Sequence, residues 1–222
     1  MALPVIPQFV ATTLTTVGAL LPIVDPLGGA PIYLAVIAGL PAADRSSMAK
    51  RVAINSFLLL VASIIGGAYV LRFFGVSIPA VQIAGGIVLC AIAWSLLHSP
   101  LTPAVSDRPR AGTEATAQHA FYPLTMPLTV GPGSISAALT LGVNAPGDLG
   151  MRFAIAMAHV CGAVLVALVI YLCYRYAERI LRRLGSTGTS VLIRLTAFIL
   201  LCIGVQIAAN GARAMFAIAA RT

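Results

Sequence analysis

Residues 22–31 read Pro22-Ile-Val-Asp25-Pro26-Leu-Gly28-Gly29-Ala-Pro31, a proline- and glycine-rich run inside a long apolar stretch. A second such run begins 105 residues later and reads Pro127-Leu-Thr129-Val-Gly131-Pro132-Gly133-Ser134. Proline and glycine interrupt helices. In lipid, an interrupted helix persists only where its free backbone groups face other protein or a cavity. Matching interruptions in two halves of a chain therefore predict a transporter-like protein whose site lies at the breaks.

The composition is that of a polytopic membrane protein, so we expect the chain to lie in a lipid bilayer. Of the 222 residues, 59% are hydrophobic and 9% are charged. The formal net charge is +8, but the basic residues are spread over short loops without interleaved aromatic residues, so we expect no nucleic-acid partner. The four cysteines lie in apolar spans without a C-x-x-C spacing, so we expect neither disulfides nor a bound metal.

A membrane-spanning helix needs roughly 20 mostly apolar residues. Six candidates meet that length, at about 9–39, 52–72, 79–98, 119–143, 152–174 and 190–212. The first is too long for one simple crossing, and we expect it to be non-helical or re-entrant near residues 22–28. The polar segment between the third and fourth spans, residues 101–118, reads as a cytoplasmic linker.

The chain therefore divides into a first three-helix repeat, residues 1–100, the linker, and a second repeat, residues 119–222. Three spans per half make the second repeat inverted relative to the first. Three sets of residues match between the halves: Pro22, Gly28, Leu34 and Pro41 with Pro127, Gly133, Leu139 and Pro146; Arg51-Val-Ala-Ile with Arg152-Phe-Ala-Ile; and Ile87-Val-Leu-Cys90 with Ile199-Leu-Leu-Cys202. We predict an all-α fold of two inverted repeats whose first and fourth helices are discontinuous.

Asp25 is the only acidic residue deep within a predicted span. A carboxylate in the bilayer is costly, so this residue is a candidate contact for substrate or a coupling ion. Asp followed by Pro is also a typical N-cap and first helical residue, so Asp25 could instead cap the half-helix that follows. The two roles can coexist.

The second break has its own pair of interpretations. A half-helix that starts after Gly131-Pro132-Gly133 would present free N–H groups and a positive dipole end to a carboxylate. Alternatively, the glycines permit close packing of two helices. Thr129 and Ser134 add hydroxyl groups, although such residues in a span more often bond to their own helix.

Four further polar residues lie within or near the spans: Asn55, His159, Gln206 and Asn210. They form a possible second polar shell around the site, and hydrogen bonding between helices is the alternative explanation. The sequence has no zinc-protease motif, nucleophile elbow, phosphate-binding loop or paired catalytic carboxylates. We therefore expect a protein that is not an enzyme and needs no cofactor.

The chain resembles the MarC family of six-span inner-membrane proteins, which includes SnatA-type transporters of small neutral amino acids. The segments that carry the resemblance are Asp25-Pro-Leu-Gly-Gly-Ala-Pro31, Phe74-Gly-Val-Ser-Ile-Pro79 with Ile83-Ala-Gly-Gly86, Pro123-Leu-Thr-Met-Pro127 through Gly131-Pro-Gly-Ser-Ile-Ser136, and Val205-Gln206 with Asn210-Gly211. One departure is that the family usually has Asn where Gly29 stands. If that Asn contacts substrate, the specificity of this chain differs.

The resemblance implies a secondary transporter that exports or exchanges small neutral amino acids, such as alanine or glycine, across the bacterial inner membrane by alternating access. A homo-oligomer is possible. An exporter of another small metabolite or drug and a non-transporting membrane scaffold are the alternatives. The residues that we predict to bind substrate are Asp25, Gly28, Gly29, Thr129, Gly131, Gly133 and Ser134.

The basic residues predict the orientation of the chain in the membrane. Nine of them follow the first, third and fifth spans: Arg45, Lys50, Arg51, Arg108, Arg110, Arg175, Arg179, Arg182 and Arg183. Four lie on the other side: Arg72, Arg152, Arg213 and Arg221. Because positive residues concentrate in cytoplasmic loops, we predict that both termini are periplasmic, as are residues 73–78 and 144–151, and that residues 40–51, 99–118 and 175–189 form cytoplasmic loops.

We expect single cysteines at Ser106 and Thr187, in a background lacking native cysteines, to resist an impermeant thiol reagent added to intact cells. Both should react after the membrane is permeabilised. Labelling of both in intact cells would reverse the orientation, and labelling of only one would contradict the six-span topology.

Overall fold

The computed structural model describes residues 5–37, 40–98, 120–143 and 149–219, in which every regular element is a helix. The predicted linker, residues 101–118, lies outside the described residues. The helices are α1 (Val5–Val24), α2 (Pro26–Val36), α3 (Ala42–Phe73), α4 (Ile78–His98), the π-helix η1 (Ala120–Thr129), α6 (Pro132–Val143), α7 (Leu149–Arg175) and α8 (Ala177–Ala219).

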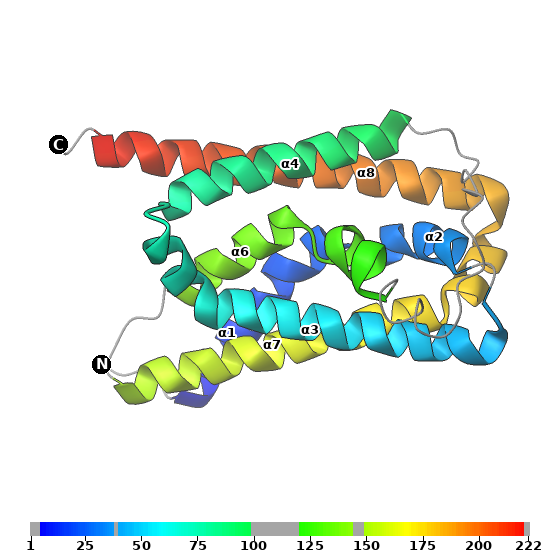
Figure 1. Ribbon diagram of the computed structural model, residues 1–222, viewed down its shortest axis with the longest axis horizontal. Coiled ribbons are helices and arrows are strands. Elements are labelled where there is room, and N and C mark those ends of the chain that lie inside the picture. Colours follow the sequence, from blue (N-terminus) through cyan, green and yellow to red (C-terminus); the bar gives the residue numbers. More distant parts are fainter. Residues whose placement is uncertain (1–4, 38–39, 99–119, 144–148, 220–222) are drawn as a thin grey trace.

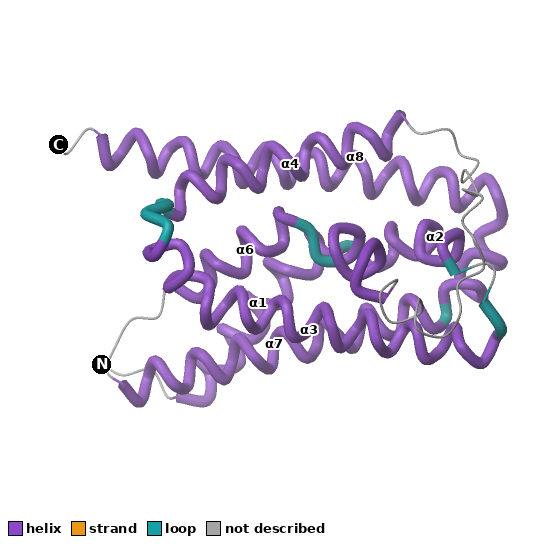
Figure 2. Tube along the Cα trace, in the orientation of Figure 1, coloured by secondary structure: helices purple, strands orange, loops and turns teal. Residues whose placement is uncertain are grey.

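The helices form an elongated bundle in which α4 lies along α8 and α3 lies along α7 (Figure 1). The elements α2, η1 and α6 lie between these two pairs, α1 crosses obliquely from the side of α7 toward α2, and both termini are at the same end of the molecule. Figure 2 shows that the described connections between helices are short and lie near the ends of the bundle, apart from the breaks within it. Among the described residues, five helices are long and apolar enough to cross a membrane, and η1 with α6 make a possible sixth crossing.

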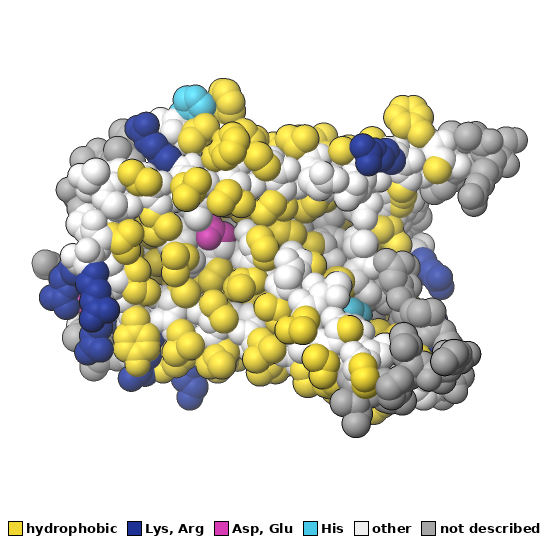
Figure 3. All heavy atoms as spheres, turned by 180° about the vertical axis from the view of Figure 1, so that it is seen from behind, with side chains coloured by type: hydrophobic (Ala, Val, Ile, Leu, Met, Phe, Trp, Pro, Cys, Tyr) yellow, Lys and Arg dark blue, Asp and Glu magenta, His cyan; other side chains and the backbone are white. Residues whose placement is uncertain are grey.

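Two apolar clusters hold the bundle together. The larger is built from α1, α2, α3, η1, α6 and α7 and includes the fully buried Leu20, Leu60 and Val166. The smaller, built on Leu89, Ala93 and Leu200, joins α4 to α8. Many large hydrophobic side chains remain exposed on the outer surface, as expected of helices that face lipid (Figure 3).

The first span is broken at one residue rather than over the expected stretch of residues 22–28. Pro22 lies inside α1, Pro26 begins α2, and only Asp25 between them has left-handed backbone angles, with φ 42° and ψ 63°. A proline at the first position of a helix fits because its missing N–H has no intrahelical acceptor there. The expectation of a discontinuous first helix is met by this single turn.

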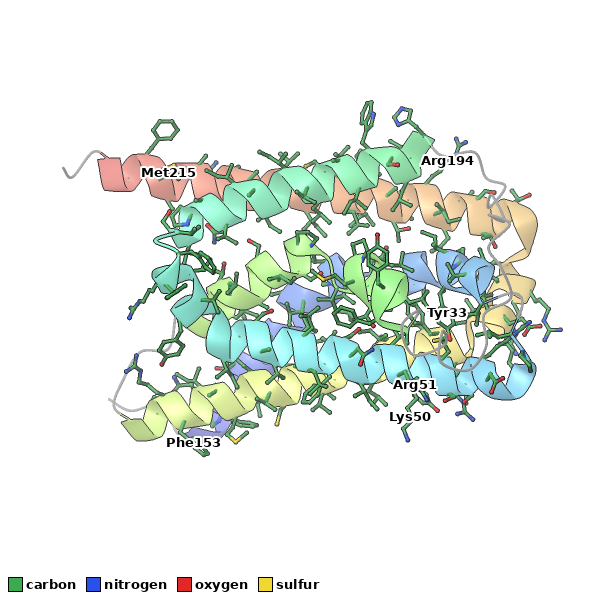
Figure 4. All side chains as sticks on the ribbon, viewed as in Figure 1. Tyr33, Lys50, Arg51, Phe153, Arg194 and Met215 are labelled. Atoms are coloured by element: carbon green, nitrogen blue, oxygen red, sulfur yellow. The ribbon has the colours of Figure 1, made fainter. Side chains whose placement is uncertain are left out.

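At the end of the bundle opposite both termini, which carries Lys50 and Arg51 (Figure 4) and is here called the basic end, the helices extend further than the apolar pattern predicted. We expected loops at residues 40–51 and 175–189, but α3 begins at Ala42, and α8 begins at Ala177 and bends at Gly185, where φ is 69°. Charged residues such as Lys50, Arg51 and Arg182 are good helix formers in water, so these helices continue past the apolar spans. Lys50 and Arg51 lie on α3 toward the end opposite both termini (Figure 4).

Glycine allows α4 and α8 to approach closely near the middle of α4. A β-carbon added at Gly86 would lie 2.6 Å from both the Gly204 carbonyl oxygen and the Ala208 nitrogen. These are backbone atoms of a helix, which cannot move aside as a flexible side chain can. Hydrogen therefore fits at residue 86, and a methyl group does not.

We predict that Gly86→Ala lowers the stability of the protein in detergent by about 1–3 kcal/mol, the usual cost of overpacking. Gly66→Ala on α3 is the matched control, because no described atom lies within 4 Å of a β-carbon there. Thermal melting and the yield of monodisperse protein would compare the two variants. Equal stability would mean that α4 and α8 separate at little cost.

Candidate functional site

Asp25 caps the half-helix that follows the first break. Its Oδ1 accepts a hydrogen bond from the Gly28 backbone N–H at 3.1 Å, and its own carbonyl accepts from the Gly29 N–H at 3.0 Å. The capping role is thus present in the structure. It uses one carboxylate oxygen, so the structural role and a ligand role do not compete for the same atom.

The second break lies between η1 and α6, which are bent by 71° relative to each other. The Met126–Pro127 peptide bond within η1 is cis, and α6 begins at Pro132. The Thr129 hydroxyl donates to the Leu124 carbonyl at 2.6 Å, so this residue does bond to its own helix. The expected discontinuity of the fourth helix is therefore observed.

A cavity of about 290 Å³ joins the two breaks. Its wall includes the seven residues that the sequence predicted as substrate contacts: Asp25, Gly28, Gly29, Thr129, Gly131, Gly133 and Ser134. The amino-terminal ends of α2 and α6 both border this space. Two positive helix-dipole ends and one carboxylate thus meet at a single cavity.

The cavity continues from the breaks toward the end opposite the termini. Its lining runs from Gly28 to Val36 on α2, from Leu89 to Leu96 on α4, and from Leu200 to Ile193 on α8. These stretches lead to the end of the bundle at which α2 and α4 finish (Figure 1). Apart from Asp25 and the hydroxyls of Thr129, Ser134 and Thr196, the side chains of the wall are apolar or absent.

Asp25 has no basic partner among the described residues. The ion pairs within the described part of the chain join Glu178 to Arg45 and to Arg182, at the basic end of the bundle. On the face shown in Figure 3, an acidic side chain is visible among hydrophobic ones, well away from the basic cluster at one end. An unpaired carboxylate in an apolar wall favours the approach of a cation.

Two stacked tyrosines form a support behind the cavity that sequence reasoning missed. Tyr33 and Tyr174 are fully or almost fully buried, and their ring centroids are 4.3 Å apart. The Tyr174 hydroxyl lies 2.9 Å from the Thr129 hydroxyl, so it links α7 to the second break. A β-carbon at Gly29 would lie 2.9 Å from the same Tyr174 oxygen, which explains why glycine fits at this position.

The four residues predicted as a second polar shell do not line the cavity. His159 is buried and its Nδ1 lies 2.7 Å from the Thr16 hydroxyl of α1, which is the hydrogen bonding between helices that we considered as the alternative. Gln206 donates to Asn210 on the same exposed face of α8 at 3.0 Å. Asn55 is half-buried on α3. The described residues contain no group of three or more His, Cys, Asp and Glu that could hold a metal ion.

Thr196 is the cavity hydroxyl that the sequence analysis did not select. It shares one face of α8 with Ile193, Ala197 and Leu200, all of which line the cavity. The spacing i, i+3, i+4, i+7 marks one face of a helix but does not say which cavity or core that face meets. Its hydroxyl donates to the Leu192 carbonyl at 2.6 Å, as threonines in spans commonly do.

Sequence comparison identifies membrane proteins that are similar to this chain. A profile described as "MarC family integral membrane protein" matches residues 9–216. A membrane protein from Methanocaldococcus jannaschii is 32% identical over 192 residues, which cover 86% of this chain and 91% of that protein. The inner membrane protein MarC of Salmonella typhimurium is 31% identical over 201 residues, with 86% and 90% covered. The Bacillus subtilis membrane protein YvbG is 31% identical over 195 residues, with the same shares. No solved structure matches significantly.

We predict that the contact between Gly29 and Tyr174 makes their substitutions interdependent. Gly29→Ala alone should cost about 1–3 kcal/mol, because the methyl group meets the Tyr174 hydroxyl. In a Tyr174→Phe background most of that cost should disappear, since the ring carbons would be 3.8 Å away. A double-mutant cycle measured by unfolding in mixed micelles would give the coupling. Additive effects would mean that residue 29 adapts without moving Tyr174.

Proposed function

Because the chain belongs to the MarC family of integral membrane proteins, we propose that it is a secondary transporter that exports or exchanges small neutral amino acids across the inner membrane. The cavity between the two helix breaks is the observation that carries this proposal. Its volume of about 290 Å³ lies at the lower end of the usual range for small-molecule sites, roughly 300–1,000 Å³. A small solute fits such a space.

The charges at the cavity suit a zwitterion. Asp25 offers a carboxylate to an ammonium group, and the start of α6, around Gly133 and Ser134, offers N–H groups and a positive dipole end to a carboxylate. Beyond these groups the wall continues as apolar side chains such as Ile32 and Leu89. We therefore expect the site to recognise the backbone of an amino acid and to favour a small side chain.

Alternating access is supported by the difference between the two ends of the bundle. Toward the basic end the cavity continues, whereas toward the end that carries the termini α4 packs closely against α8 and α6. There the Gln82 amide donates to the Thr140 hydroxyl at 3.0 Å, and a β-carbon at Gly85 would lie 2.8 Å from the Ser136 Cβ. With the basic end in the cytoplasm, this arrangement corresponds to an inward-facing state with periplasmic termini.

The proposed architecture is a pair of inverted repeats, α1 to α4 and η1 to α8. Both repeats begin with a broken helix, and both breaks border the same cavity. The helices that would be equivalent, α3 with α7 and α4 with α8, pack against each other. Exchange of conformation between the two repeats would close the basic end and open the other.

The test is competition for uptake of labelled alanine into proteoliposomes. Unlabelled serine and glycine should compete. Propionate and ethylamine each lack one of the two charges and should compete at least tenfold more weakly, because each loses a charge-assisted hydrogen bond. Lysine and glutamate should compete poorly, because the apolar wall offers no partner for a second charged group. Equal competition by propionate would contradict recognition of both charges.

Asp25→Asn separates the charge from the cap in the same assay, because Asn caps helices as well as Asp does. We expect alanine flux to fall at least tenfold at an unchanged folded yield. Asp44→Asn is the matched control, since Asp44 lies in the first turn of α3 and does not line the cavity. The absence of any solute flux in the unmodified protein would favour a scaffold, and wild-type flux in Asp25→Asn would leave Asp25 as a cap only.

A further inference from the structure

Two side-chain oxygens, one from the residue at the first break and one from α8, approach each other beside Gly28 at the cavity wall. A β-carbon at Gly28 would lie 2.7 Å from the Thr196 hydroxyl oxygen and would also collide with Asp25 Oδ2. Glycine at residue 28 lets both oxygens come this close to its backbone. The carboxylate of the break and a hydroxyl of α8, distant in sequence, therefore converge on one point at the cavity wall.

Both oxygens have acceptor capacity that the protein does not use. The Thr196 proton is directed to the Leu192 carbonyl at 2.6 Å, with Ile193 as a second acceptor at 3.2 Å, so its lone pairs are available. Asp25 Oδ1 accepts from the Gly28 N–H, and Oδ2 has no hydrogen bond or ion pair to any residue that the structure describes. A space bordered by acceptors, one of them charged, favours a cation or a strong donor.

The backbone at the end of α1 adds to this preference. Residue 26 is a proline and has no N–H, so the Pro22 carbonyl loses the donor that a continuous helix would supply four residues later. The negative dipole end of α1 meets the positive dipole end of α2 at this break, so the helix dipoles offset each other and the carboxylate decides which charge is favoured. Ile23 and Val24, in the last turn of α1, line the same cavity.

We infer that Asp25 Oδ2 and Thr196 Oγ1 form a subsite for a monovalent cation at the cavity wall beside Gly28. The cation is either the ammonium group of the transported solute or a sodium ion that binds with it, since carboxylate and hydroxyl oxygens suit both. This inference refines the proposed transport function and assigns Thr196 a direct part in recognition. It requires that Thr196 acts through its lone pairs rather than through its volume.

The experiment measures cation binding to the purified protein without any transport step. The protein is kept in choline chloride, and its thermal midpoint is followed during titration with ethylamine hydrochloride or with sodium chloride at constant ionic strength. One of the two cations should raise the thermal midpoint of the unmodified protein. A shift with ethylamine would identify the ammonium group of the solute as the bound cation, and a shift with sodium would identify a sodium ion. If neither shifts it, the inference is wrong.

Thr196→Val keeps the shape of the side chain and removes the oxygen. In this variant the concentration of the active cation that gives a half-maximal shift should rise about tenfold or more, the loss expected for a contact to a charged group. Thr196→Ser should respond within about twofold of the unmodified protein, because the acceptor is retained. An unchanged response in Thr196→Val would overturn the assignment.

Thr189→Val is the matched control, because Thr189 also donates to its own helix, to the Gly185 carbonyl at 2.7 Å, and does not line the cavity. It should leave the cation response unchanged. Should Thr196→Val fail to fold, Thr196→Cys provides a second variant of similar size with a weak acceptor, and it should also lose the response. A full response in Thr196→Cys would count against the subsite.

The result of the cation titration can be distinguished from the result of the transport assay. A cation response that depends on Thr196, together with no alanine flux, would keep the subsite and reject the proposed amino-acid transport. Alanine flux with the expected competition, together with a cation response that ignores Thr196, would keep the transport function and reject the subsite.

Discussion

The structure depends on how one break in a membrane helix is satisfied. Lipid offers no hydrogen bonds, so the backbone groups freed where α1 ends and α2 begins must find partners within the protein. Asp25 supplies one of these partners, because its left-handed turn ends α1 and its carboxylate accepts from the Gly28 N–H at the start of α2. The break can then lie beside a cavity, and α2 can present its first turn to that cavity instead of continuing the line of α1.

Glycine has opposite uses on the two sides of that cavity. Gly86 and Gly204 bring the backbones of α4 and α8 together on the side of the cavity toward the termini, where an added methyl group would collide with backbone atoms. Gly28 and Gly29 keep side chains out of the cavity wall, where Asp25, Thr196 and Tyr174 already approach. Close packing at one end and open space at the other give the bundle an asymmetry that is consistent with the proposed alternating access.

Local signals in the sequence predicted the breaks and therefore most of the cavity wall. Proline and glycine act on their own backbone, so Asp25 and Gly131 were identifiable without a structure. Thr196 and Tyr174 were not, because their importance comes from contacts with residues far away in the chain, and an apolar span does not reveal which face meets the site. The helical start of α3, residues 42–51, was also missed, since hydropathy detects the lipid-spanning part of a helix and not its aqueous extension.

The presence of a carboxylate at this break is informative beyond its capping geometry. Asn and Ser cap helices about as well as Asp and carry no charge, so capping alone does not explain why a charge is placed among apolar side chains. In the structure one oxygen of Asp25 caps α2, and the other borders the space shared with Thr196. A cation in the proposed subsite would offset part of the cost of burying this charge. In the proposed transport cycle, a cation that enters and leaves would therefore change the energy of the break itself and would couple occupancy of the site to the packing of α2 against α8.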